Sequence, residues 1–381
     1  MKLSINYKIL LLAFFAVLVT SLSEKNAYIL LLFSIICYFF TPYRKWWDSI
    51  SLSLLFFSLL YVLMLYINNR TDCGPALILS YLISPVAFYR FGCLIIELFQ
   101  TDIYRQRFLL FTFICYLFPV FLLTLQDIAL VGLINETRIL LDVVNKKTAL
   151  AATIYGMMSS LGIGCTISVF CKKNTIWRRN IWIILVSLSM LVVVHLINRT
   201  GIVIFVVCFF VSFTISNGPK WSKIIPLLSI ICLISFLLLQ GNTLNNDIFN
   251  AYSAREEISS SNASDLGGRT ERWINSIEKL FINPFGWGTD RYAHNLWLDI
   301  ARLVGIFPFI AFIIATYIYV KSFLSLLKTK MLSTFRNILI SVNVAILLNS
   351  FVEPVIEASF SYFCISMMIW GMTKTVTVEN K

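Results

Sequence analysis

Apolar runs of about 20 residues, separated by short polar segments, recur along the whole chain. That length is what an α-helix needs to cross the hydrocarbon core of a bilayer. The pattern therefore predicts an all-α polytopic membrane protein with about twelve transmembrane helices in a single integral membrane domain, residues 1–381. The expected spans are 6–22, 27–41, 49–68, 75–98, 108–127, 149–171, 180–197, 201–217, 223–240, 296–320, 337–352 and 359–373.

Loops rich in lysine and arginine alternate with loops that are poor in them, and this alternation orients the expected helices. Cytoplasmic loops of membrane proteins carry the excess of these residues. Placing the rich loops inside puts both termini in the cytoplasm and leaves two outer segments, a short one at 128–148 and a longer loop at 241–295. The rich loops contain Arg44 and Lys45, Arg105 and Arg107, Lys172, Lys173, Arg178 and Arg179, Lys220 and Lys223, and the segment from Lys321 to Arg336.

The outer loop at 241–295 has a pattern of its own. Its apolar residues Trp273, Ile277, Leu280 and Phe281 recur at helical spacing, which predicts an amphipathic helix lying on the membrane surface. The turn-forming sequence Asn-Pro-Phe-Gly-Trp-Gly at 283–288 ends this helix. The pair His294-Asn295 then opens the next span.

Composition narrows the class of protein. Only 13% of the residues are charged and 59% are hydrophobic, whereas soluble domains carry about a quarter charged residues. One large soluble helical core is therefore excluded. The net charge of +12 follows from the basic loops, so it indicates no nucleic-acid partner. The nine cysteines are interpreted as packing residues, because most lie within apolar spans and none has metal-ligand spacing.

The chain contains two histidines, and their surroundings differ. His195 lies near the end of an apolar span, which favours a packed or hydrogen-bonded structural role. His294 lies at the expected outer interface, where an imidazole of ordinary pKa can take a proton from a hydroxyl at neutral pH. The alternative for His294 is an interfacial residue that caps a helix.

Three arginines on the same outer side are candidates for binding a phosphate group. Arg199 lies in a tight turn between two spans, and Arg269 and Arg272 are one helical turn apart in the outer loop. A guanidinium group matches phosphate oxygens with two parallel hydrogen bonds. The alternatives are lipid-headgroup contacts for Arg199 and salt bridges for the other two. We find no carboxylate pair for a metal-bound donor, so no metal or cofactor is expected.

Other charged residues form a second tier. Arg90 lies within a span, where an ion pair between helices is the alternative to a functional role. Asp299 and Arg302 follow His294 at helical spacing, so either residue could orient the imidazole or pair with the other. Glu353 and Glu357 lie near an outer turn and are left out of the candidate site as interfacial or ion-paired residues.

Together these features resemble the O-antigen polymerase and O-antigen ligase superfamily, the Wzy and WaaL proteins. The resemblance covers residues 190–310 and has three parts. They are an arginine just before a span (Asn198 to Gly201), the loop segment from Arg269 to Gly288, and a histidine that opens a span, with Gly305 about three turns further on.

The resemblance implies a metal-independent glycosyltransferase with a helical, GT-C-like membrane fold. Its arginines at the positions of Arg199 and Arg269 would bind the undecaprenyl pyrophosphate of the donor, and His294 would activate the acceptor hydroxyl. Arg272 is kept as a third pyrophosphate ligand, although the family position fits Arg269 better. The location implied is the bacterial inner membrane, with the loop 241–295 and the active site facing the periplasm.

The acceptor decides between two activities. A polymerase moves the growing glycan onto a new lipid-linked repeat unit, whereas a ligase moves the finished chain onto lipid A-core. Ligases tend to carry a longer insertion before the histidine, and here only nine residues run from Phe285 to Ala293. We therefore favour the polymerase. The expected partners are the undecaprenyl-pyrophosphate-linked oligosaccharide donor and acceptor, the lipid bilayer and a chain-length regulator protein.

Two readings from other classes remain open. A flippase or another transporter of lipid-linked polysaccharide would also be basic and polytopic, but it would more often show inverted repeats or charged, broken helices near the midplane. A purely structural membrane protein would need no cluster of histidine and arginines. The gathering of the candidate residues at one face favours an enzyme.

Overall fold

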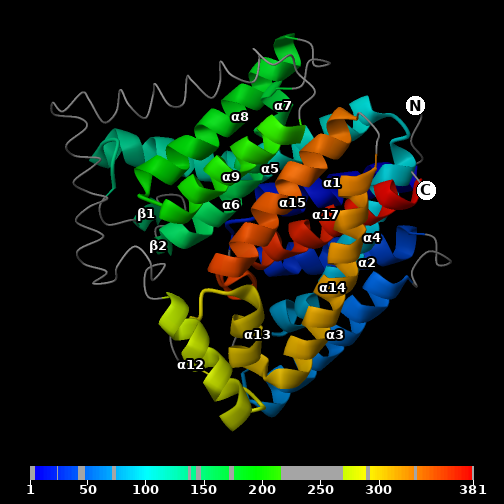
Figure 1. Ribbon diagram of the computed structural model, residues 1–381, viewed down its shortest axis with the longest axis vertical. Helices are drawn as coiled ribbons and strands as arrows, with labels where there is room; N and C mark the ends of the chain where they lie inside the picture. The colour runs from blue at the N-terminus through cyan, green and yellow to red at the C-terminus, as the bar shows by residue number, and fades with distance from the viewer. Residues whose placement is uncertain are drawn as a thin grey trace. The chain divides into compact units, whose positions relative to one another are not determined.

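The computed structural model describes residues 5–23, 25–41, 48–70, 74–135, 139–142, 147–170, 176–215, 269–288, 292–329 and 333–379. The chain forms two compact units (Figure 1). The first unit comprises Met1–Pro119 and Arg272–Lys381, and the second comprises Val120–Glu271. Each unit is described by itself below.

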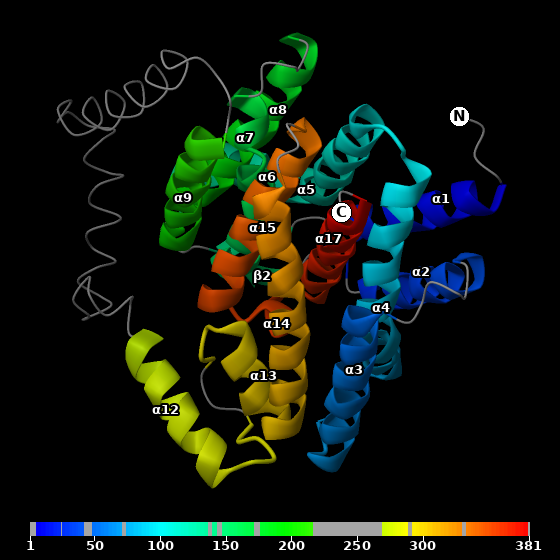
Figure 2. The same cartoon turned by 45° about the vertical axis from the view of Figure 1, so that its right-hand side comes forward.

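The first unit is a helical bundle built from both ends of the chain. Helices α14 and α3 lie side by side, and α17 lies against α4 (Figure 2). Its helices are α1 (Ile5–Val19), α2 (Asn26–Phe40), α3 (Ser49–Ile67), α4 (Pro75–Leu98), the first part of α5 (Asp102–Val131), most of α12 (Arg269–Ile282), α13 (Leu296–Val304), α14 (Ile306–Lys328), α15 (Thr334–Val352), α16 (Val355–Ala358) and α17 (Phe360–Glu379).

Two glycines let α4 and α17 approach backbone to backbone. A Cβ atom on Gly92 would overlap the carbonyl oxygen of Met368, and one on Gly371 would overlap that of Tyr89. Small residues at helix contacts are typical of membrane proteins, where close van der Waals packing holds helices together. Away from this contact, large apolar side chains of α3, α5 and α14 are exposed, as expected of a surface that faces lipid.

In its described residues, the second unit is helical apart from one antiparallel pair of strands. It holds the rest of α5, β1 (Ile139–Asp142), β2 (Lys147–Ala151), α6 (Ala152–Gly164), α7 (Ile167–Phe170), α8 (Ile176–His195), α9 (Arg199–Ile215) and the first residues of α12. The two strands pair antiparallel, with Ile139 opposite Ala151. The all-α class is confirmed for the described residues, and this short pair of strands is an addition that the sequence did not predict, because its residues are too few to show periodicity between two spans.

Six helices in the described part are long and apolar enough to cross a membrane, and four more are apolar but shorter. Each expected span that falls on described residues contains helix, whereas the span at 223–240 and most of the loop at 241–295 lie outside them. Helix α4 continues through Pro85 and Arg90. The count of twelve spans stays a prediction.

The expected span at 296–320 is two helices, not one. Gly305 ends α13 and begins α14 with φ +84, a left-handed conformation that breaks an α-helix. A Cβ on Gly305 would overlap the carbonyl oxygen of Pro284, which accepts a 2.8 Å hydrogen bond from the N–H of Ile306. The break thus fixes the 283–288 turn against the start of α14.

Candidate functional site

His294 lies in a left-handed turn immediately before α13. Its φ is +55, a conformation that costs a residue other than glycine on the order of 1–3 kcal/mol and persists only where the surroundings hold it. The next residue, Asn295, caps α13 by accepting the N–H groups of Trp297 and Leu298 at 3.2 Å each. The Asn295 amide also donates to the carbonyl of Phe351 at 3.2 Å. The turn is therefore tied to the ends of two helices.

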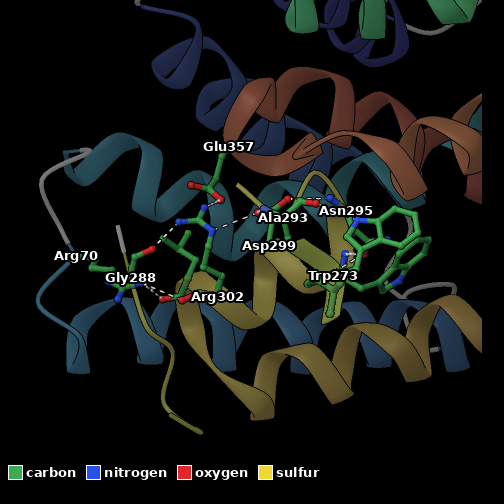
Figure 3. Close-up of polar contacts among 11 residues, drawn as sticks. Arg70, Trp273, Gly288, Ala293, Asn295, Asp299, Arg302 and Glu357 are labelled. Atoms are coloured by element: carbon green, nitrogen blue, oxygen red, sulfur yellow. Dashed lines mark hydrogen bonds and ion pairs between the residues drawn. The ribbon is translucent and has the colours of Figure 1, made fainter. Parts of the chain in front are cut away.

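Asp299 reaches back from α13 to the same turn. Its Oδ1 accepts the N–H of Ala293 at 2.8 Å and its Oδ2 accepts the N–H of Asn295 at 3.0 Å (Figure 3). The two donors flank His294. The side chain of Asp299 thus contacts backbone on both sides of the candidate base, and not its imidazole.

The imidazole of His294 faces a glutamate. Its Nδ1 lies 3.4 Å from Oε2 of Glu353, the residue that follows α15. The side chain of His294 is 23% exposed and that of Glu353 is 5% exposed. A proton on Nδ1 would be donated to this carboxylate, which leaves Nε2 as the proton acceptor. The rings of Tyr292 and His294 lie edge to face, with their centroids 6.2 Å apart.

Arg302 connects Asp299 to two further segments. Its Nε donates to Oδ1 of Asp299 at 3.2 Å, its Nη1 donates to the carbonyl of Gly288 at 2.6 Å, and its Nη2 pairs with Oε1 of Glu357 (Figure 3). Burial disfavours the charge on the guanidinium, but the carboxylates of Glu357 and Asp299 outweigh this effect and raise the pKa of Arg302. The pairing of Asp299 with Arg302 is the alternative named from the sequence.

The 283–288 turn packs on the end of α13. The N–H groups of Trp287 and Gly288 donate to the carbonyl of Arg302 at 3.0 and 3.1 Å. From the end of α3, Asn68 donates to the carbonyl of Phe285 at 2.7 Å, and Arg70 donates to that of Leu303. Two of the three sequence features behind the family resemblance, the turn and the histidine with its following glycine, thus meet in the first unit.

Helix α12 confirms the predicted helix over 273–281. Its residues Ile274, Ile277, Phe281 and Ile282 are exposed, and its Trp273 indole donates to the carbonyl of Ala293 at 3.0 Å. An apolar cavity of 460 Å³ lies beside this contact. It is lined by Trp273, Ile277, Asn295, Trp297, Leu298, Phe309, Ile313, Thr316, Tyr317 and Phe351.

In the second unit, Arg269 reaches the residue that follows Arg199 at the start of α9. Arg199 is the first residue of that helix, and Nη1 and Nη2 of Arg269 both lie 3.5 Å from the hydroxyl of the adjacent Thr200. The side chain of Asn198 caps the helix by accepting the N–H of Gly201 at 2.9 Å. A helix N-terminus with two guanidinium groups favours an anion.

The candidate site residues predicted from the sequence belong to both units. His294, Asp299, Arg272 and Arg90 belong to the first unit, and Arg199 and Arg269 belong to the second. Arg272 is half-buried on α12, one turn after Arg269. Arg90 is buried in α4, and its Nη2 lies 3.3 Å from the hydroxyl of Ser51. Its position in the sequence is far from that of the His294 turn.

His195 has the structural role expected from the sequence. It is fully buried, and its Nε2 lies 2.8 Å from Oδ2 of Asp127 while its Nδ1 lies 2.9 Å from the carbonyl of Leu133. Asn135 donates to the same Asp127 oxygen at 2.6 Å. This network joins the ends of α5 and α8.

Comparisons with protein-family models and with curated proteins find no match. Among the described residues, no group of three or more His, Cys, Asp or Glu side chains could hold a metal ion.

Sequence reasoning considered Glu353 and Glu357, because carboxylates beside apolar spans are functional candidates by default, but it left them out of the candidate site. In the structure they contact His294 and Arg302 respectively. Arg70 was missed. It follows the two asparagines that end the third expected span, where polar residues are unremarkable.

Proposed function

We propose that this chain is a glycosyltransferase of the O-antigen polymerase type, which transfers a growing glycan from undecaprenyl pyrophosphate onto a new lipid-linked repeat unit. The sequence resemblance over residues 190–310 motivates the proposal. The observation that carries it is the contact of 3.4 Å between Nδ1 of His294 and Oε2 of Glu353. A partly exposed imidazole suits a general base when its Nδ1 faces a buried carboxylate and its Nε2 is left to accept a proton.

In the proposed reaction, Nε2 of His294 takes the proton of the acceptor hydroxyl as that oxygen attacks C1 of the donor sugar. The bond from C1 to the pyrophosphate oxygen breaks on the opposite side, and the pyrophosphate leaves with its electron pair. General base catalysis of this kind contributes typically 10²–10⁴ in rate. Glu353 would stabilise the imidazolium that forms.

Arginines would stabilise the leaving pyrophosphate. The pairing of Arg269 with Thr200 at the start of α9, one residue from Arg199, supports a shared role for these two guanidinium groups. Their positive charge and the helix N-terminus would offset the charge that grows on the leaving group, an electrostatic contribution of several kcal/mol. Arg272 is proposed as a third ligand of the same group.

The polymerase is preferred over the ligase because the connection from Phe285 to Ala293 is short. The proposal places the protein in the bacterial inner membrane, with twelve spans, both termini in the cytoplasm and His294 at the periplasmic face. Its donor and acceptor are then both lipid-linked oligosaccharides.

A lipopolysaccharide gel from a strain that lacks the gene tests this function. We expect lipid A-core that carries a single repeat unit, because ligation survives while polymerisation is lost. The wild-type gene should restore the ladder of chain lengths, and His294→Ala, produced at the same level in the membrane, should not.

Two results would contradict the proposal. Bare core with long polymer on the lipid carrier would make the protein a ligase. An unchanged ladder in the deletion strain would exclude both glycosyltransferase activities and favour another class of membrane protein.

A further inference from the structure

The turn that carries His294 is organised around one buried carboxylate. Asp299 is 4% exposed, and each of its oxygens accepts a backbone N–H, from Ala293 at 2.8 Å and from Asn295 at 3.0 Å. Backbone N–H groups that converge in a turn form a concavity that binds anions. Here the chain's own carboxylate fills that concavity, so a substrate phosphate cannot use it.

The position of Asp299 is itself fixed by a salt bridge. Nε of Arg302 donates to its Oδ1 at 3.2 Å, and Arg302 is held in turn by the carbonyl of Gly288 and the carboxylate of Glu357. Arg302 is 3% exposed. Arg302 therefore connects the carboxylate of Asp299, which holds the backbone around His294, to the turn at 283–288 and to helix α16.

We propose that Asp299 is a positioning residue for His294: it holds the left-handed turn from both sides and thereby keeps the imidazole against Glu353. The inference rests on the proposed function in which His294 is the general base. The alternative is that Asp299 only stabilises the first turn of α13, where a negative charge is favourable in any helix.

The variant Asp299→Asn separates these roles. Its amide has the size of the carboxylate but a single oxygen, so its NH₂ group faces one of the two backbone N–H groups and that bond is lost. The turn then relaxes and the imidazole moves away from Glu353. Misplacement of a catalytic group by about 1 Å costs up to roughly 100-fold in rate, so we expect a loss of about 10- to 100-fold.

Activity is measured in membranes from the deletion strain that produce each full-length variant. The probe is the lipid-linked repeat unit extracted from that strain, and the readout is polymer formed per amount of protein. If Asp299 acts through His294, the double variant Asp299→Asn/His294→Ala forms as much polymer as His294→Ala alone. A double variant that is clearly less active would mean that Asp299 acts independently, which overturns the inference.

Glu379→Gln provides the matched control. Glu379 also pairs with a buried arginine of the first unit, Arg105, at 3.0 Å, but it has no contact with the His294 turn. Replacement of this half-exposed carboxylate by an amide should leave the rate within about twofold of wild type, because such an ion pair contributes little.

Hydrogen exchange of the purified full-length protein gives a readout that needs no substrate. The amides of Ala293 and Asn295 should exchange faster in Asp299→Asn than in wild type, while Glu379→Gln leaves them unchanged. Unchanged exchange at both amides in Asp299→Asn would overturn the positioning role.

The outcomes distinguish this inference from the proposed function. Wild-type activity of Asp299→Asn beside a His294→Ala variant that retains only a small residual rate would overturn the inference alone. Wild-type activity of His294→Ala would overturn the assignment of the base, and the inference with it.

Discussion

In the proposed reaction, the nitrogen of His294 that accepts the proton is set by a residue 59 positions further along the chain. A neutral imidazole carries its proton on either nitrogen, and a hydrogen bond at one nitrogen decides which nitrogen is left to act as a base. Glu353 supplies that bond from the end of α15, and its own side chain is buried. The proposed reaction therefore needs the glutamate and the histidine together.

We predict that Glu353→Gln lowers the rate of polymer formation by about 10- to 100-fold, a part of what the base contributes. The amide is as large as the carboxylate but cannot stabilise an imidazolium ion. The measurement is the ladder of chain lengths per amount of protein in the deletion strain. Glu353→Asp keeps the charge and should retain more activity than Glu353→Gln; equal loss in both variants would contradict an electrostatic role.

Residue type and local spacing selected some candidate site residues, but not their partners on other helices. His294 was found because a lone histidine at an outer interface is conspicuous, and Asp299 because it follows at helical spacing. Glu353 and Glu357 could not be paired with their partners, since both contacts form between helices distant in sequence. Hydrophobic periodicity predicts which residues lie on a helix, but not which helices meet.

At the scale of secondary structure, Gly305 separates the His294 turn from the membrane-length helix α14. Because its φ is +84, α13 and α14 cannot continue into one another, and the carbonyl of Pro284 occupies the space that a side chain would need. The glycine was noted in the sequence, but the break was not predicted, because the apolar run continues across it. The other expected spans that fall on described residues contain helix, although the span at 149–171 is likewise divided, into α6 and α7.

We predict that Gly305→Ala destabilises the protein by about 1–3 kcal/mol from backbone strain, with a further loss from the overlap with Pro284. Gly74→Ala is the control, because Gly74 has a similar φ of +82 with no atom within 4 Å of an added Cβ. Thermal unfolding in detergent should show the larger decrease for Gly305→Ala. Equal decreases would mean that the contact with Pro284 contributes nothing.

The pair of strands β1 and β2 shows the other limit of pattern reading. Its two strands contain four and five residues, too few for an alternation to stand out from the neighbouring apolar runs. Because they pair with each other, the backbone groups that face the partner strand are satisfied without a larger sheet.

At the scale of the whole molecule, the distribution of lysine and arginine predicts which side of the membrane each loop occupies. Reporter fusions test this orientation. Alkaline phosphatase joined after Gly288 should be active, because that turn is expected in the periplasm. Green fluorescent protein joined after Lys328, at the other end of α14, should fluoresce in the cytoplasm. The reverse pattern would place His294 in the cytoplasm and exclude the proposed reaction.

The close contact of α4 with α17 has a consequence for biogenesis. Cys93 in α4 donates to the carbonyl of Gly371 at 3.5 Å, although 278 residues separate them. At a synthesis rate of about 5–20 residues per second, these 278 residues take roughly 14–56 s to emerge. During that interval the glycine face of α4 is already in the bilayer without its partner, so insertion factors or lipids must cover it until the ribosome has finished.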